Sequence, residues 1–286
     1  MGFEFKAIAM DIDGTLLNSD GKMSKKTKEA LLLAQSKGVK LILSTGRPAN
    51  ITYDIANELE MDKKEHEGYL LTDNGALLKS AVDHKIIFED KISVDLAKHI
   101  LGVIEKYPGL YPFYMDDGHI YVHDAYEAIV DSRGNGNEDE IINMHKLQAR
   151  AGNYLLQEVK RMKDFVSKPI FKMHTSNQPD YIKKHLEDIK RDMGDQVEVL
   201  ATYPAVTEFN KKGISKGKSL SKLGINMEDI IAFGDSVNDI DMLKSVGCGV
   251  AMGNALEEVK EIADEITESN DNDGIYYSLK KHGLFD

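Results

Sequence analysis

The chain has very little cysteine and no long apolar segment. Its single cysteine, Cys248, stands alone among 286 residues, so no disulfide can form within the chain and an oxidising compartment is not implied. No apolar run approaches the length of a membrane span, and the amino-terminal region lacks the apolar stretch of a signal peptide. These absences favour a cytoplasmic protein.

Positive charge is also scarce. There are 36 Lys and Arg residues against 48 Asp and Glu residues, and the net charge of −12 argues against nucleic acid or an anionic membrane as the main partner, since both bind basic surfaces. The 42% of hydrophobic residues is ordinary for a globular protein, and the length allows one large domain or two smaller ones. An acidic protein can still bind a phosphate group locally, through a metal ion, a lysine and backbone N–H groups.

The most informative stretch is the first expected strand and the turn after it. An apolar run leads into Asp11 and Asp13, and Gly14 follows at once. Residues two apart on a strand share a face, so both carboxylates leave the strand in one direction, and Gly14 lets the backbone turn beside them. Two acids held this close repel each other unless a cation lies between them. The pair indicates a divalent-metal site, or a nucleophile with an acid/base partner; the structural alternative is an aspartate-rich turn.

Strands and helices alternate over the first 80 or so residues. We expect strands at 39–43 and 69–72, with helices after Ser24 and after Pro48. This order is typical of a parallel sheet with crossover helices, in which ligands bind beyond the carboxyl ends of the strands. Asp11, Asp13, Thr45 and Asn74 all fall at such ends, which is the first strong indication of a functional site.

The pattern changes between about residue 85 and residue 204. Strands and helices no longer alternate regularly, a hairpin is expected at 111–123 with its turn at Asp116–Gly118, and a mostly helical region is expected up to about Phe165. We interpret residues 85–204 as an α+β domain inserted into an α/β domain made of residues 1–84 and 205–286.

A second acidic strand end appears after the alternating pattern resumes. An expected strand at 230–233 runs into Asp235, Asn238 and Asp239. Mg²⁺ prefers oxygen ligands and few protein carboxylates, and the two acidic strand ends can meet only in a parallel sheet. We therefore favour a metal site over the alternative of an acid-rich helix start.

Two further features indicate phosphate binding. Thr45 and Gly46 lie between a strand and a helix start, where backbone N–H groups receive an anion, although a simple helix cap is equally compatible with them. Lys216 lies in a glycine-flanked turn, but three other lysines lie nearby and its own surroundings do not select it. Together these residues describe phosphoryl transfer, in which a carboxylate attacks phosphorus while a hydroxyl, a lysine and Mg²⁺ hold the phosphate.

The motifs resemble those of the haloacid dehalogenase (HAD) superfamily. They are Asp11–Thr15, Ser44–Arg47, Gly213–Gly217 and Gly234–Asp239, in that order. The large insert between Thr45 and Lys216 is similar to that of the Cof-type sugar-phosphatase branch, which has a type IIB cap. The resemblance implies a Rossmann-like parallel-sheet core with an inserted α+β cap, and a Mg²⁺-dependent phosphatase that acts on small phosphorylated metabolites such as sugar phosphates.

The resemblance also implies roles for individual residues. Asp11 would be the nucleophile that forms an aspartyl-phosphate, and Asp13 the general acid/base. The metal would be held by Asp11, Asp13, Asp235 and Asp239, the second of these through its backbone carbonyl and the last as support for the metal shell. The phosphate would be held by Thr45, Gly46, Lys216 and Asn238.

Two alternatives remain open on the sequence. A phosphomutase uses the same core but returns the phosphoryl group to its product. A phospho-accepting regulatory module also arranges acids, a hydroxyl and a lysine around Mg²⁺, but the long separation of Thr45 from Lys216 exceeds one crossover unit, and Asp13 would have no role there. The sequence does not indicate which phosphorylated metabolite is the substrate, nor the oligomeric state.

Overall fold

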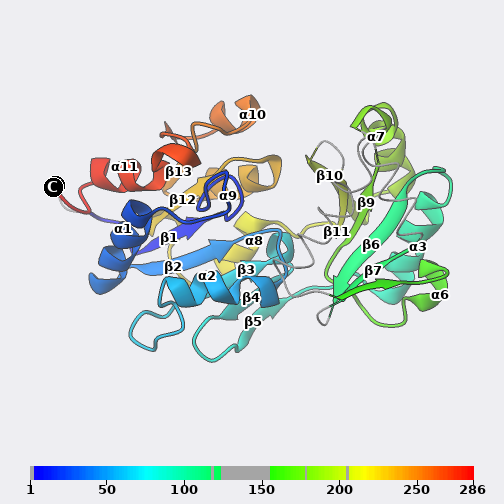
Figure 1. The fold of residues 1–286 in the computed structure, drawn as a ribbon, viewed down its shortest axis with the longest axis horizontal. Helices are drawn as coiled ribbons and strands as arrows, with labels where there is room; N and C mark the ends of the chain where they lie inside the picture. Colours follow the sequence, from blue (N-terminus) through cyan, green and yellow to red (C-terminus); the bar gives the residue numbers. More distant parts are fainter. Residues whose placement is uncertain (1–2, 117–118, 124–154, 178, 204–205) are drawn as a thin grey trace. The chain divides into compact units, whose positions relative to one another are not determined.

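The computed structural model describes residues 3–116, 119–123, 155–177, 179–203 and 206–286 (Figure 1). The chain forms two compact units. The core unit contains Met1–Glu89 together with Ile214–Asp286, and the inserted unit contains Asp90–Gly213. No helix of the described ranges has the length and apolar character needed to cross a membrane.

The core unit combines short helices with an eight-stranded sheet. Its elements are β1 (Ala7–Met10), α1 (Lys25–Ser36), β2 (Lys40–Ser44), α2 (Tyr53–Glu58), β3 (Tyr69–Thr72), β4 (Leu77–Ser80), β5 (Ile86–Glu89), α8 (Lys216–Leu220), β12 (Ile230–Gly234), α9 (Ile240–Ser245), β13 (Cys248–Ala251), α10 (Glu257–Lys260), β14 (Glu265–Ile266) and α11 (Gly274–Lys281).

The strand order across the core sheet is β14-β13-β12-β1-β2-β3-β4-β5. The six strands from β14 to β3 are parallel, and β4 and β5 are antiparallel additions at one edge. Strand β1 is central: Ala7 pairs with Ile230 of β12 on one side and with Lys40 of β2 on the other. The parallel α/β core expected from the alternating pattern is therefore confirmed.

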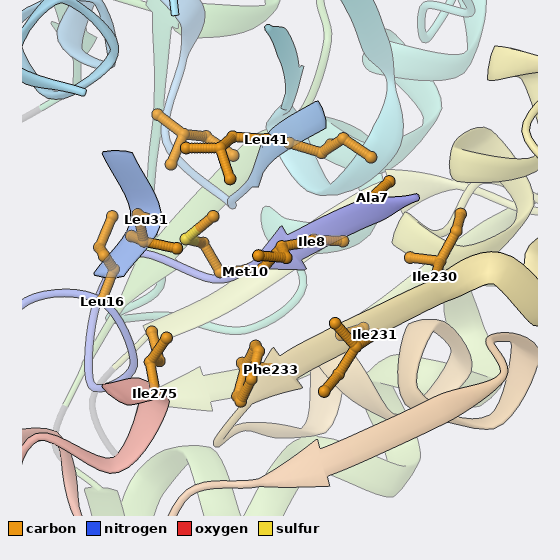
Figure 2. Close-up of a cluster of buried hydrophobic side chains, with 14 of the residues drawn as sticks. Ala7, Ile8, Met10, Leu16, Leu31, Leu41, Ile230, Ile231, Phe233 and Ile275 are labelled. Atoms are coloured by element: carbon orange, nitrogen blue, oxygen red, sulfur yellow. The ribbon is translucent and has the colours of Figure 1, made fainter. Parts of the chain in front are cut away.

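Continuous apolar runs explain why these strands are central. All four residues of β1 and all five of β12 are buried, as expected for strands covered on both faces. Met10, Leu31 of α1 and Ile275 of α11 belong to one cluster of buried side chains (Figure 2). Full burial of each such side chain contributes about 1.5–3 kcal/mol. This packing fixes the positions of the strand ends that carry the polar residues.

Helix α1 shows how the local sequence sets an element's ends. The hydroxyl of Ser24 accepts a hydrogen bond from the backbone N–H of Thr27 at 3.1 Å, which satisfies one of the unpaired donors of the first turn. Ala30, Leu31 and Ala34 are buried on one side of the helix, and Gly38, with φ +85°, follows the last turn in the left-handed conformation that ends many helices.

The inserted unit is built on a six-stranded, mainly antiparallel sheet. Its elements are α3 (Val94–Ile104), β6 (Tyr111–Asp116), β7 (His119–Val122), β8 (Leu155–Glu158), α6 (Met162–Phe165), β9 (Met173–Ser176), α7 (Pro179–Met193), β10 (Val197–Tyr203) and β11 (Val206–Lys211). The order of the described strands is β10-β11-β9-β6-β7-β8, and among these only β7 and β8 pair in parallel.

The boundaries of the two units differ from the expected ones. Strand β5 pairs with β4 and so belongs to the core sheet, which moves the first boundary from residue 85 to Asp90. Strand β11 pairs with β9 and β10, which moves the second boundary from residue 204 to Gly213. Both shifts have the same cause. Strand pairing decides which sheet β5 and β11 join, and the sequence does not show this pairing.

The expected hairpin forms between β6 and β7, where Tyr114 pairs with Tyr121. Its turn residues 117–118, and the part of the expected helical region before residue 155, lie outside the described ranges. The helical expectation up to Phe165 is wrong for 155–158, which form β8 beside β7. A short apolar run does not distinguish a helix from a strand by its periodicity, and here the neighbouring strand decides.

Candidate active site

Four neighbouring parallel strands of the core unit end in polar residues. In spatial order they are β12, β1, β2 and β3, and they are followed by Asp235, Asp11, Thr45 and Asp73 respectively. Because the strands are parallel and adjacent, their carboxyl ends lie along one edge of the sheet. Residues distant in the sequence are thereby brought into one cluster.

Three carboxylates and a lysine form the centre of this cluster. Asp11, Asp235 and Asp239 each place a carboxylate oxygen within 4.8 Å of the others. Lys216 donates to Asp11 Oδ1 at 2.7 Å and to Asp239 Oδ1 at 2.6 Å. The lysine side chain is fully buried, so its charge is neutralised by these carboxylates rather than by water.

The structure distinguishes Lys216 from its neighbours. Lys211 and Lys212 form ion pairs with Asp90 and Glu198 in the inserted unit. Lys218 is exposed, whereas Lys216 is the first residue of α8 and points into the cluster. The ambiguity among nearby lysines is thus resolved by burial.

Burial and crowding shift the pKa values of the clustered groups. Burial raises the pKa of Asp11 well above its ordinary value, Lys216 opposes this shift, and the other acids add to it. Burial and the charge of Asp239 raise the pKa of Asp235 to about 6. Burial alone would lower the pKa of Lys216, but its two carboxylate partners outweigh it and raise that pKa above its usual range. The cluster carries more negative charge than one lysine can balance.

Asp239 differs from the other two acids because both of its oxygens already have partners. Oδ1 accepts from Lys216, and Oδ2 accepts from the backbone N–H groups of Asp235 at 3.0 Å and Ser236 at 3.1 Å. A Cβ atom at Gly234 would lie 2.5 Å from Asp239 Cβ, so this approach requires glycine. Asp239 therefore fixes the lysine and the loop that carries Asp235.

Asp13 lies beside the cluster and has its own counterion. Arg47 donates through Nε to Asp13 Oδ2 at 2.7 Å and through Nη2 to Asp13 Oδ1 at 2.5 Å. This bidentate arrangement holds the carboxylate in a fixed orientation. The backbone N–H of Arg47 in turn donates to the Thr45 hydroxyl oxygen at 3.1 Å, so one short loop positions both side chains.

The turn after β1 is shaped by its contacts with the loop after β12. The Thr15 hydroxyl donates to Asp235 Oδ1 at 3.0 Å. Gly14 has φ +77°, and a Cβ there would lie 2.5 Å from Asp235 Oδ2. Asn254 donates to the Gly14 carbonyl at 2.8 Å and closes the turn from outside. Any side chain at Gly14 would displace an acid of the cluster.

The end of β3 connects the remaining predicted residues. Asp73, Asn74 and Gly75 all have positive φ, and this strained turn directs Asn74 Oδ1 to accept from Asn238 at 3.0 Å. The backbone N–H of Asn74 donates to the Thr45 carbonyl at 3.1 Å, and Ser219 of α8 donates to the Gly75 carbonyl at 2.7 Å. Helix α8, which carries Lys216, is thereby attached to the turn that follows β3.

The predicted residues thus meet in two groups. Asp11, Lys216, Asp235 and Asp239 contact one another or lie together, while Thr45, Gly46 and Asn238 line the adjoining strand ends. Sequence reasoning assigned no role to Thr15, Arg47 or Asn254. Thr15 and Arg47 belong to the motifs Asp11–Thr15 and Ser44–Arg47, and this membership is the sequence feature that could have indicated a role for them. No sequence feature indicates a role for Asn254.

A parallel sheet whose adjacent strand ends carry clustered carboxylates, a buried lysine and a hydroxyl defines an α/β enzyme core suited to phosphoryl groups. Comparison with known proteins assigns the family. The chain belongs to the haloacid dehalogenase-like hydrolases, whose family model matches residues 8–279. The resemblance stated from the motifs is confirmed.

Individual relatives agree with this assignment. A putative phosphatase of Streptococcus pyogenes serotype M6, M6_Spy0533, is 29% identical over 96% of this chain and 97% of its own length. The 5-amino-6-(5-phospho-D-ribitylamino)uracil phosphatase YcsE of Bacillus subtilis is 29% identical over 97% of this chain and 95% of its own. The solved structure of the HAD subclass IIB sugar phosphatase BT4131 matches with a TM-score of 0.78 and 28% identity, covering 98% of this chain and all of that one.

The chain is accordingly a hydrolase of phosphoric monoesters, a phosphatase that acts on small phosphorylated substrates. This class disfavours the regulatory-module alternative. Phosphatases of the superfamily generally use a divalent metal ion, and Asp11, Asp235 and Asp239 are the described acids that could hold one here.

Proposed function

We propose that this protein is a Mg²⁺-dependent phosphatase that hydrolyses small phosphorylated metabolites, sugar phosphates in particular, through an aspartyl-phosphate on Asp11. The observation that carries the proposal is the buried cluster in which Asp11, 2.7 Å from Lys216, lies among two further acids. We expect the enzyme to act in the cytoplasm, since its one cysteine allows no internal disulfide.

The donor set at the cluster fits Mg²⁺. All of its donors are oxygen atoms, and they are few and compact, which suits an ion that demands octahedral geometry and keeps several waters. Asp11, Asp235 and the backbone carbonyl of Asp13 would hold the ion. Asp239 would support them, because its oxygens are used by Lys216 and two backbone N–H groups. Once bound, the ion would offset the repulsion between Asp11 and an incoming phosphate.

Asp11 is the proposed nucleophile. Its carboxylate oxygen would attack phosphorus, the bond from phosphorus to the leaving-group oxygen would break, and the alcohol would depart with a proton from Asp13. Asp13 would then take a proton from a water molecule whose oxygen attacks the aspartyl-phosphate, which releases inorganic phosphate and restores Asp11. Lys216, Thr45, Gly46 and Asn238 would hold the phosphate oxygens and spread their charge.

The contact between Asp13 and Arg47 adds a condition to this cycle. Both carboxylate oxygens of Asp13 accept from N–H groups of Arg47, and proton donation to a leaving group requires the protonated acid. Arg47 would therefore release Asp13 when substrate binds. The guanidinium of Arg47, released from Asp13, would then pair with the incoming phosphate. One movement of Arg47 would thus bind the substrate and leave Asp13 free to take up the proton that it donates.

The substrates of relatives support the sugar-phosphate class. The name of YcsE places the phosphate on a ribityl group, and BT4131 is described as a sugar phosphatase. The test is a panel of phosphorylated metabolites, assayed with Mg²⁺ for phosphate release and ranked by kcat/KM. We expect sugar and sugar-alcohol phosphates to rank first. Product analysis with a hexose monophosphate separates the alternatives: free sugar supports hydrolysis, and an isomeric sugar phosphate would show a phosphomutase instead.

A further inference from the structure

A second cluster of metal-ligating side chains lies in the core unit, away from the carboxyl ends of the strands. Cys248 is the first residue of β13, Glu265 is the first residue of β14, and His282 directly follows α11. The acids of the active site follow the opposite ends of the parallel strands. The phosphatase mechanism uses none of these three residues.

The donor atoms of these three side chains lie at distances that suit one ion. Cys248 Sγ and His282 Nε2 are 3.8 Å apart, His282 Nε2 and Glu265 Oε2 are 3.0 Å apart, and one atom from each residue lies within 4.8 Å of the others. Zinc bonds of about 2.3 Å to sulfur and about 2.0 Å to nitrogen or oxygen place tetrahedral donors about 3.3–3.6 Å apart. Small side-chain movements would bring the three atoms around a common centre.

We propose that Cys248, Glu265 and His282 form a second metal site, which takes a thiophilic divalent cation of the Zn²⁺ type and leaves a fourth position to water. Sulfur, imidazole and carboxylate donors in one site favour such an ion over Mg²⁺, which is bound by oxygen alone. The partial exposure of His282 leaves room for the water. The two ends of the sheet would then select different metals by donor chemistry.

Lys281 competes with the ion for the carboxylate of Glu265. Lys281 Nζ donates to Glu265 Oε2 at 2.9 Å, but the lysine side chain is 66% exposed and can turn into solvent when a cation replaces it. His282 is also held by an edge contact with the Phe5 ring, at 5.4 Å between centroids, which restricts the imidazole without covering its Nε2 contacts.

The cysteine is suited to a structural site rather than to redox or nucleophilic chemistry. Burial, together with the nearby acids, raises the pKa of Cys248 to about 11, so the metal-free thiol is neutral and unreactive. A bound cation would displace the thiol proton and supply the missing positive charge. Glu265, held by Lys281 and His282, keeps a pKa below its ordinary value despite burial, and so offers an anionic oxygen.

The test uses Co²⁺ as a spectroscopic substitute for Zn²⁺ on the full-length reduced protein. Thiolate ligation gives cobalt a sulfur-to-metal charge-transfer band in the near ultraviolet. Because Cys248 is the chain's one cysteine, this band reports the second site alone, even when Co²⁺ also occupies the oxygen donors of the active site. We expect the band to saturate by two equivalents of added Co²⁺, one for each site, and Zn²⁺ to abolish it by displacement.

Matched variants identify the ligands. Cys248→Ser should abolish the band, and Glu265→Gln and His282→Asn should each weaken Co²⁺ binding at least about tenfold. The controls Glu261→Gln and His185→Asn change the same residue types elsewhere and should leave the titration unchanged. Lack of a band in the wild-type protein would overturn the proposal, as would unchanged affinity in the glutamate or histidine variant. If one ligand variant does not fold, the wild-type titration and the other variant still decide.

Discussion

Each unit contains a buried lysine beside a buried carboxylate, yet the two surroundings differ in charge. In the core unit Lys216 contacts Asp11 and Asp239, and Asp235 lies close by. In the inserted unit Lys172 Nζ lies 2.7 Å from Glu208 Oε1, and the ring of His174, stacked on Phe113, lies beside them.

Charge balance separates these two clusters. Burial lowers the pKa of His174 to about 3, so the histidine is neutral and one lysine faces one carboxylate among the groups described there. The core cluster sets three carboxylates against one lysine and has raised acid pKa values. A balanced pair is satisfied by its own partners, whereas an excess of buried acid has a use only if a cation or a proton joins it. The excess of carboxylates therefore distinguishes the cluster around Lys216, which is suited to catalysis, from the balanced ion pair of Lys172 and Glu208.

The largest expected effect follows from removing the proposed nucleophile. Asp11→Asn keeps the size of the side chain but removes the attacking anion, so kcat for phosphate release should fall by about 10⁴-fold or more. The removal of one negative charge from the crowded cluster should leave folding intact, which thermal unfolding checks. The control Glu261→Gln removes an acid from the surface and should retain full activity. Near-normal turnover by Asp11→Asn would contradict the covalent mechanism.

Metal withdrawal tests the excess charge directly. A chelator should reduce hydrolysis to background, and Mg²⁺ should restore it. Ca²⁺ takes more ligands at longer distances and tends to engage both oxygens of one carboxylate, so it should inhibit in competition with Mg²⁺. Mg²⁺ should also raise the midpoint of thermal unfolding in the wild-type protein but much less in Asp235→Asn. Full activity in chelator would refute the metal assignment.

The acid/base role of Asp13 predicts a dependence on the leaving group. Asp13→Asn should lower kcat/KM for an alkyl phosphate by about 10²–10⁴-fold, because its leaving oxygen needs a proton. The loss should be smaller for an aryl phosphate, whose phenolate departs readily. Equal losses for both substrates would argue against proton donation. Arg47→Lys, which keeps the charge but not the bidentate contact, should weaken substrate binding and so raise KM.

Substituting each buried lysine contrasts the two clusters. Lys216→Met leaves Asp11 and Asp239 without their counterion and should abolish activity, and Lys172→Met should lower the free energy of unfolding by about 3–5 kcal/mol. The double variant Lys172→Met/Glu208→Leu should recover most of that loss, as replacement of a buried pair by apolar side chains often does. Activity should not recover in Lys216→Met/Asp239→Leu. Denaturant unfolding and phosphate release measure the two outcomes.

The smallest expected effect is a pH dependence of stability. The pKa of His174 is about 3 in the folded protein and about 6.5 in the unfolded chain, so the unfolded state binds more protons between these values. Stability from this residue is therefore full above pH 6.5 and decreases as the pH falls, by about 2 kcal/mol at pH 5. His174→Gln should flatten this part of the profile in denaturant titrations. An unchanged slope would show that His174 is not buried as a neutral group.

Much of the active site can be predicted from the sequence, because the alternation of apolar strands and helices indicates a parallel sheet. An apolar run that ends in Asp11 and Asp13, and a second that ends in Asp235, define strand ends from the sequence alone. Their meeting depends on strands β12 and β1 being neighbours, which the alternating pattern allows but does not specify. Only the resemblance selects Lys216 from the four nearby lysines, because its burial depends on how α8 packs against the end of β3.

Other features depend on contacts that no local pattern encodes. The pairing of Arg47 with Asp13 requires two loops to approach side by side, and the two oxygens of Asp239 could not be assigned before their donors were placed. The unit boundaries were misplaced for the same reason, since β5 and β11 are ordinary strand sequences whose partners decide their sheet. Local sequence propensity identifies the individual strands and helices, and long-range strand pairing decides which sheet each strand joins.

The pairing of β1 with β12 also has a consequence during synthesis of the chain. The first strand leaves the ribosome long before Ile230–Gly234 exists, and at about 5–20 residues per second the delay is roughly 10–45 s. Until then the apolar surface of β1 has a partner on one side only. The inserted unit, in contrast, is one continuous segment that can fold as soon as it emerges. Nascent chains of this protein should therefore expose an unfinished, aggregation-prone sheet for most of their translation, and gain the phosphatase centre only after the last quarter of the chain has begun.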